Sequence, residues 1–220
     1  MESELVLVQT PFVFMIVTIH PDNPDPRKIQ IIVKAIQAGS VIVYPTDTVY
    51  SFGCDIKNTK GIERIARIKG KKFKEANFSI VCDDLSQLSN FCKPITSPVF
   101  KMMKRALPGA YTFILDANTN VPKIFREKKK TIGIRVPDNN IARAIVAELG
   151  GPIIASSVHD EDKIIEYTTD PELIEERLGN QVEIVVSGGF GGIEPSTVVD
   201  CTGGDIEIVR EGKGSLDLLA

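Results

Sequence analysis

The chain changes abruptly from apolar to polar between residues 41 and 50, which read VIVYPTDTVY. The apolar run Val41–Tyr44 predicts a buried β-strand, and Pro45 predicts its end because proline lacks the N–H that a strand ladder needs. Thr46, Asp47 and Thr48 follow at once. Proline and aspartate also occur in ordinary turns, but ligands of open α/β sheets bind beyond strand ends. These hydroxyls and this carboxylate are therefore candidates for a binding site.

On both sides of this stretch, apolar residues with helical spacing alternate with short apolar runs that predict strands. Helices are expected over residues 29–36, 62–68, 85–91, 98–107, 141–149 and 171–178. Further strands are expected over residues 16–19, 78–82, 111–115, 131–136, 153–156, 182–186, 197–200 and 206–209. Because no helix separates the last strands, part of the sheet should be antiparallel. The pattern predicts an α/β (α+β) fold with a mixed sheet.

Length and composition indicate one domain. The chain has 220 residues, of which 43% are hydrophobic and 25% charged, as is usual for globular proteins. We expect a single domain over residues 15–220. Residues 1–14 are largely apolar but contain two glutamates and no lysine or arginine, unlike a signal peptide. We expect them to be an N-terminal extension that is non-native or disordered, with an extra edge strand as the alternative.

The charge and the cysteines exclude some classes of function. A net charge of −3 argues against a broad, non-specific nucleic-acid surface, although it leaves room for a local basic patch. The chain has four cysteines without a C-x-x-C pair and only two histidines, so we expect no metal site. Cys54 and Cys82 lie in apolar runs and are expected to be reduced core residues. This usage favours a cytoplasmic protein with no membrane partner.

Cationic residues that could bind an anion occur at three places in the sequence. Lys69 and Lys71 belong to the basic run KGKKFK, which follows a predicted helix and is either a phosphate clamp or a solvated loop. Arg135 lies inside an apolar strand, where arginine is rare unless it is paired. It either pairs with a core carboxylate or points into a cavity, where its planar guanidinium suits a phosphate or carboxylate ligand. Arg210 follows the last predicted strand, and Ser196 precedes another, which again suits an anion.

Two other segments are less specific. Ser157 ends a predicted strand, where its hydroxyl either receives a ligand or caps a turn. His159 follows it and is expected to be structural rather than catalytic. The glycines within residues 188–192 match neither a Walker A loop nor G-x-G-x-x-G, and we interpret them as a flexible turn.

In this order, the segments resemble the YrdC/YciO family, whose best-known members are threonylcarbamoyl-adenylate synthases. The resemblance covers nearly everything from about His20 to Gly214 and is closest to the YciO branch. It rests on Val41–Gly53 (VIVYPTDTVYSFG), Pro108–Leu115 (PGAYTFIL), Thr131–Pro137 (TIGIRVP), Pro195–Asp200 (PSTVVD) and Val209–Gly212 (VREG).

The resemblance implies a YrdC/RibB-like twisted mixed sheet, largely closed around a positively charged cavity and flanked by helices. It implies an enzyme that combines L-threonine, bicarbonate and ATP into threonylcarbamoyl-AMP and pyrophosphate, with Mg²⁺, for the modification of tRNA. It also implies tRNA or double-stranded RNA as a partner. The oligomeric state does not follow from it.

The resemblance implies roles for individual residues as well. The catalytic residues would be Lys69 and Arg135. The nucleotide would be bound by Lys69, Lys71, Ser157, Ser196 and Arg210. Threonine would be bound by Thr46, Thr48, Thr112 and Arg135.

The chain departs from the family pattern at two positions. Lys71 replaces the arginine of the K-x-R motif, which keeps the charge but loses the bidentate fork. His159 replaces the asparagine of the S-x-N motif, which removes an amide that both donates and accepts. The alternative function is therefore a YciO-branch protein that binds nucleotide or double-stranded RNA, with no adenylate chemistry or a different one.

Overall fold

The computed structural model describes residues 15–73, 76–126, 130–158, 168–203 and 206–219. Its helices are α1 (Pro26–Gln37), α2 (Thr59–Ile68), α3 (Leu85–Ser89), α4 (Ser97–Ala106), α5 (Lys123–Arg126), α6 (Asn140–Leu149), α7 (Pro171–Leu178) and the 3₁₀ turn η2 (Leu216–Leu218). Its strands are β1 (Met15–Thr18), β2 (Ile42–Tyr44), β3 (Ser51–Gly53), β4 (Ser79–Val81), β5 (Tyr111–Asp116), β6 (Thr131–Arg135), β7 (Ile153–Ser157), β8 (Ile184–Ser187), β9 (Thr197–Asp200) and β10 (Glu207–Arg210).

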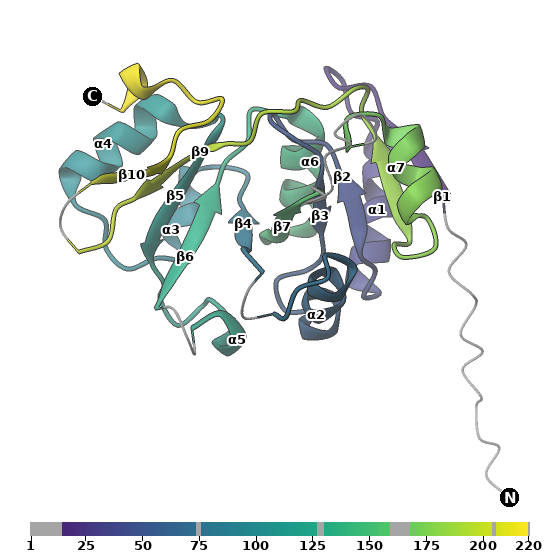
Figure 1. Cartoon of the computed structure of the whole chain (residues 1–220), viewed down its shortest axis with the longest axis horizontal. Helices are drawn as coiled ribbons and strands as arrows, with labels where there is room; N and C mark the ends of the chain where they lie inside the picture. Colours follow the sequence, from purple (N-terminus) through teal and green to yellow (C-terminus); the bar gives the residue numbers. More distant parts are fainter. Residues whose placement is uncertain (1–14, 74–75, 127–129, 159–167, 204–205, 220) are drawn as a thin grey trace, which may run out of the picture.

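All these strands belong to one sheet, in the order β1-β8-β2-β3-β7-β4-β6-β5-β9-β10. Strands β4 and β6 are parallel, whereas β5 and β6 are antiparallel, as are β9 and β10. Figure 1 shows the strong twist of the sheet and the helices that flank it. The predicted mixed sheet with an antiparallel part is confirmed.

Local signals in the sequence explain where helices begin and end. Helix α1 begins after Asp25, whose carboxylate accepts a hydrogen bond from the backbone N–H of Arg27 at 2.9 Å. It ends before Gly39, which has a φ of 99° that few other residues adopt. Helix α7 begins after Asp170, whose carboxylate accepts from the backbone N–H of Glu172 and caps the helix.

Apolar clusters lie on both faces of the sheet. One contains Ile32 of α1 and Ile145 of α6, packed on strand residues such as Tyr44. The other contains Ile62 of α2 and Met103 of α4. The predicted burial of Cys54 and Cys82 is also confirmed, and burial raises the pKa of the Cys54 thiol to about 12. These thiols are therefore core side chains rather than nucleophiles.

One part of the sheet is covered on a single face only. Along β5, the side chains of Tyr111, Phe113 and Leu115 are buried, whereas the alternate residues Thr112, Ile114 and Asp116 are only half-buried. Strand β6 repeats this alternation, because Ile132 and Ile134 are buried whereas Thr131 and Gly133 are half-buried. Since successive side chains of a strand point to opposite faces, one face of β5 and β6 is less covered than the other by the described residues, and we call it the open face.

The sequence analysis missed strand β3, which pairs with β2 as an antiparallel hairpin. This strand is short and ends in a glycine, so no alternating pattern announces it. Gly53 is needed there because a side chain would contact the ring of Tyr44 at 2.7 Å. The 45–50 segment is therefore the connection of a hairpin.

The glycine-rich segment 188–192 is packed rather than free. The hydroxyl of Tyr50 donates to the carbonyl of Gly189 at 2.6 Å and accepts from the N–H of Gly188 at 3.2 Å. The N–H of Gly192 donates to the carbonyl of Thr48 at 2.8 Å. A side chain at Gly192 would collide with that carbonyl. The segment thus holds the 45–50 turn in place, and its interpretation as a flexible turn is corrected.

Substitution of Gly192 by alanine tests this packing. The added methyl group meets backbone rather than a movable side chain, so we expect a loss of about 1–3 kcal/mol in the free energy of unfolding. Gly151→Ala is the matched control because nothing lies within 4 Å of its added methyl group. Urea unfolding of both variants measures the effect. Equal stability of the two variants would contradict the packing role.

Candidate functional site

The threonines of the 45–50 turn form a chain of hydrogen bonds. The hydroxyl of Thr46 donates to the carbonyl of Val49 at 2.7 Å and accepts from the N–H of Thr48 at 3.1 Å. The two threonine hydroxyls lie 3.0 Å apart. Because the Thr46 proton is already used, Thr48 donates to Thr46, and its oxygen accepts from Arg135 at 3.0 Å. Both hydroxyl protons are donated within the turn. The turn therefore contacts Arg135 through the oxygen of Thr48 and holds its guanidinium in place.

Arg135 forms a buried ion pair with Asp47. Its Nη2 lies 2.8 Å from Oδ1 of Asp47, and the two side chains are 6% and 8% exposed. The other carboxylate oxygen accepts from the backbone N–H of Asp138 at 3.1 Å. The Nε of Arg135 is buried without a hydrogen-bond partner. Buried donors are nearly always paired, so this unpaired N–H makes Arg135 an unusual buried cation.

A second cationic group lies beside the first. Nε and Nη2 of Arg210 donate to the carbonyl of Ser196 at 3.2 and 2.8 Å. The Ser196 hydroxyl lies 2.7 Å from that of Thr112. Partial burial and then the positive charge of Arg135 lower the pKa of Arg210. Two neighbouring guanidinium groups repel each other because both are positively charged. A bound anion reduces this repulsion, so the pair favours an anionic ligand.

The third group joins α2 to β7. Lys69 follows the last turn of α2, and its Nζ donates to the carbonyl of Ser157 at 2.5 Å. Ser157 pairs with Ser51 on β3, and the next N–H, of Val158, donates to the carbonyl of Tyr50 at 2.8 Å. Lys69 and Ser157 therefore lie at the end of the 45–50 turn.

The structure thus places the predicted site residues in three groups around one turn. The groups are Thr46, Thr48 and Arg135; Thr112, Ser196 and Arg210; and Lys69 with Ser157. Lys71 lies in the loop after α2, where its N–H donates to the carbonyl of Ala66. His159 lies outside the described residues.

Asp47 was predicted only as a general binding-site candidate, and Lys213 was not predicted at all. Asp47 was quoted as part of the turn, but nothing local identified Arg135 as its partner. Lys213 lies just beyond the VREG motif, and its Nζ donates to the backbone carbonyl of Asp47. A lysine directly after that motif is the signal that could have suggested it.

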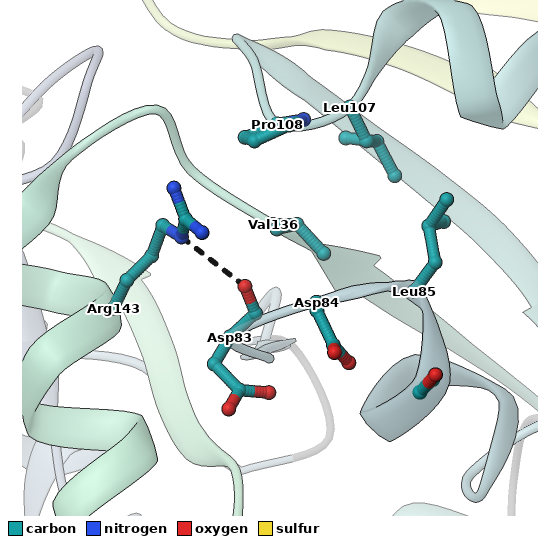
Figure 2. A pocket seen from close by; sticks show the side chains of 8 residues that line it. Asp83, Asp84, Leu85, Leu107, Pro108, Val136 and Arg143 are labelled. Carbon is teal, nitrogen blue, oxygen red and sulfur yellow. Dashed lines mark hydrogen bonds between the residues drawn. The ribbon is translucent and has the colours of Figure 1, made fainter.

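A separate cavity of about 240 Å³ lies near the end of β6. Figure 2 shows Asp83, Asp84 and Arg143 around it, with Nε of Arg143 donating to the carbonyl of Asp83 at 3.2 Å. Val136, the residue after Arg135, also lines it. None of the predicted site residues lines this cavity, so it is distinct from the three groups.

The described residues contain neither a cluster of metal ligands nor a helix suited to crossing a membrane. Among them, no three histidine, cysteine, aspartate or glutamate side chains gather in a way that could hold a metal ion. Within the same ranges, no helix has the length and apolar character needed to cross a membrane.

Comparison with known proteins identifies relatives that share this fold. The Sua5/YciO/YrdC family model, described as "Telomere recombination", matches residues 34–212. The protein YciO of Escherichia coli K12 is 43% identical over 200 residues, which are 90% of this chain and 95% of YciO. The crystal structure of E. coli YciO superposes with a TM-score of 0.85 at 41% identity, over 94% of this chain and 99% of that chain.

More distant relatives include enzymes. The threonylcarbamoyl-AMP synthase of Bacillus subtilis is 31% identical over 202 residues, which are 90% of this chain and 57% of the synthase. The crystal structure of P. abyssi Sua5 complexed with L-threonine has a TM-score of 0.81 at 26% identity, over 90% of this chain and 57% of that chain. With a family model that spans most of its length and an E. coli relative matched almost end to end, the chain belongs to the Sua5/YciO/YrdC family.

Proposed function

We propose that this chain is a cytoplasmic L-threonylcarbamoyladenylate synthase. It combines L-threonine, bicarbonate and ATP into threonylcarbamoyl-AMP and pyrophosphate, which supplies the threonylcarbamoyl group for the modification of an adenosine in tRNA. In this proposal the open face of β5 and β6 belongs to a positively charged cavity inside the single domain 15–220. Residues 1–14 are an extension without a part in the reaction.

One observation carries this proposal. Arg135 is 95% buried, already neutralises Asp47 and still has a buried N–H without a partner, while Arg210 lies close enough for the two charges to interact. An anion with several oxygens satisfies both arginines. The synthases among the relatives and the threonine complex of P. abyssi Sua5 favour a threonine carboxylate and a nucleotide phosphate as those anions.

The proposed chemistry follows from this arrangement. The amine of threonine adds to bicarbonate and releases water, which gives a carbamate. A carbamate oxygen then attacks the α-phosphorus of ATP, and pyrophosphate leaves with the electron pair of the broken P–O bond. Arg135 holds the threonine carboxylate beside Thr112, and Lys69 stabilises the charge that develops on the phosphates. Thr46 and Thr48 contribute by holding Arg135 through their hydrogen bonds.

The nucleotide is assigned to the two outer groups. Ser196 and Arg210 bind it on one side, and Lys69, Lys71 and Ser157 bind it on the other. In this proposal Mg²⁺ enters as the MgATP complex, held mainly by phosphate oxygens and water. The metal then neutralises phosphate charge, and the side chains named here do the positioning.

The presence of lysine at position 71 favours a second candidate function. Because lysine replaces the arginine of the K-x-R motif, the bidentate phosphate contact is missing. The second candidate is a protein that binds nucleotide or double-stranded RNA and has no adenylate chemistry, or a different one. A gel shift with tRNA and with double-stranded RNA at several salt concentrations separates the candidates, since phosphate contacts weaken steeply with salt.

Release of labelled pyrophosphate from ATP tests the proposed reaction directly. We expect release only when L-threonine and bicarbonate are both present, because the carbamate is the nucleophile. Omission of either substrate is the control. Binding of ATP without any release under these conditions would contradict the synthase function and favour the second candidate.

Substitution of the outer cations tests the assignment of the nucleotide. Arg210→Gln and Lys69→Gln should each weaken MgATP binding about ten- to a hundred-fold, because a charge-assisted hydrogen bond contributes about 1.5–3 kcal/mol. Arg67→Gln is the matched control, since Arg67 is exposed in the last turn of α2, just before Lys69. Calorimetric titration measures the affinities, and unchanged affinity in both test variants would exclude this site.

A further inference from the structure

Gly133 lies in the open face of β6, although a glycine inside a strand weakens it. Its backbone does not require glycine, since Gly133 is absent from the residues with positive φ. It is half-buried, between Ser79 on β4 and Ile114 on β5. The three atoms nearest to an added Cβ belong to neighbouring Thr112, Ser79 and Phe78, at 3.1, 3.3 and 3.8 Å. The first two contacts are tight, so the glycine lets Thr112 and Ser79 approach closely, and it also keeps the floor of this face low.

The register of the strands places this low floor between two of the cationic groups. Gly133 pairs with Ser79, and Ser79 pairs with Ala155 on β7. Two residues from Gly133 along β6 lies Arg135, whose side chain is on the same face. On β7, Ser157 lies two residues beyond Ala155, in the direction that leads away from the row of Arg135. The carbonyl of Ser157 accepts a hydrogen bond from Lys69. The row of Gly133 is thus midway between the rows of Arg135 and Ser157.

The spacing decides which ligand fits. At about 3.3 Å per residue, the rows of Arg135 and Ser157 are about 13 Å apart along the strand direction. A single phosphate or an amino acid reaches one of the two ends but cannot join them. A nucleoside triphosphate carries all its anionic groups in the triphosphate and a nucleoside beside them, so it can place its phosphates at one end and extend its nucleoside across the face toward the other.

We propose that Gly133 is the floor of a passage that the nucleotide crosses between the Lys69–Ser157 group and the Arg135–Arg210 group. The absent side chain selects for an extended nucleotide, and a side chain at this position blocks the crossing while each end remains able to bind a short anion. This inference rests on the proposed nucleotide site, but it does not require that the bound nucleotide reacts.

Calorimetry on Gly133→Val with three ligands tests the passage. MgATP is the bridging ligand, whereas inorganic tripolyphosphate and L-threonine each occupy one end. We expect the affinity for MgATP to fall at least tenfold, while the affinities for tripolyphosphate and L-threonine stay within twofold of those of the unmodified chain. Gly151→Ala, a glycine substitution in open space, should leave all three affinities unchanged.

A second variant covers the case in which Gly133→Val fails to fold. Ile114→Phe raises the floor from the paired position on β5 without changing the glycine, and it should show the same selective loss. Unchanged MgATP affinity in the folded variants, or an equal loss for tripolyphosphate, would overturn the passage.

The outcomes separate this inference from the proposed reaction. A selective loss of MgATP affinity together with no pyrophosphate release refutes the reaction and supports the passage. Pyrophosphate release by the unmodified chain, without a selective loss of MgATP affinity in the variants, refutes the passage but not the proposed reaction. If the unmodified chain binds no MgATP, both are wrong.

Discussion

The buried ion pair between Arg135 and Asp47 is the interaction on which the rest of the site depends. It joins the end of β6 to the connection between β2 and β3, and Thr48 and Lys213 add hydrogen bonds to the same two residues. Removing one partner of a buried pair typically costs about 3–5 kcal/mol, because the other charge stays buried and unpaired. For this reason Arg135 cannot simply be deleted, and Arg210 and Lys69 are the better probes of binding.

The tight packing of the 45–50 turn also keeps Asp47 in place for its ion pair with Arg135. Tyr50 binds the glycine-rich segment through its hydroxyl, and burial raises the pKa of that hydroxyl to about 12, so it remains a neutral donor at physiological pH. Gly192 closes against the carbonyl of Thr48. The turn that carries Asp47 is therefore fixed before a ligand arrives, which is the preorganisation that electrostatic catalysis needs.

Much of the fold follows from local sequence, whereas only part of the site does. The spacing of apolar residues predicts the helices, and the caps at Asp25 and Asp170 show where two of them begin. An arginine inside an apolar strand correctly indicated a ligand or a buried partner, but not which one. The pairing of Asp47 with Arg135 spans 88 residues and that of Lys213 with Asp47 spans 166. Such contacts depend on how the strands are ordered in the sheet, which no local pattern specifies.

The proposed site can be tested by a crystal structure of the chain with L-threonine and a non-hydrolysable ATP analogue. We expect an anionic oxygen within hydrogen-bond distance of the guanidinium of Arg135, with the nucleotide in contact with Arg210 and crossing the open face of β6. Ligands bound elsewhere, for example in the cavity beside Asp83 and Arg143 (Figure 2), with the Nε of Arg135 still unpaired, would contradict it.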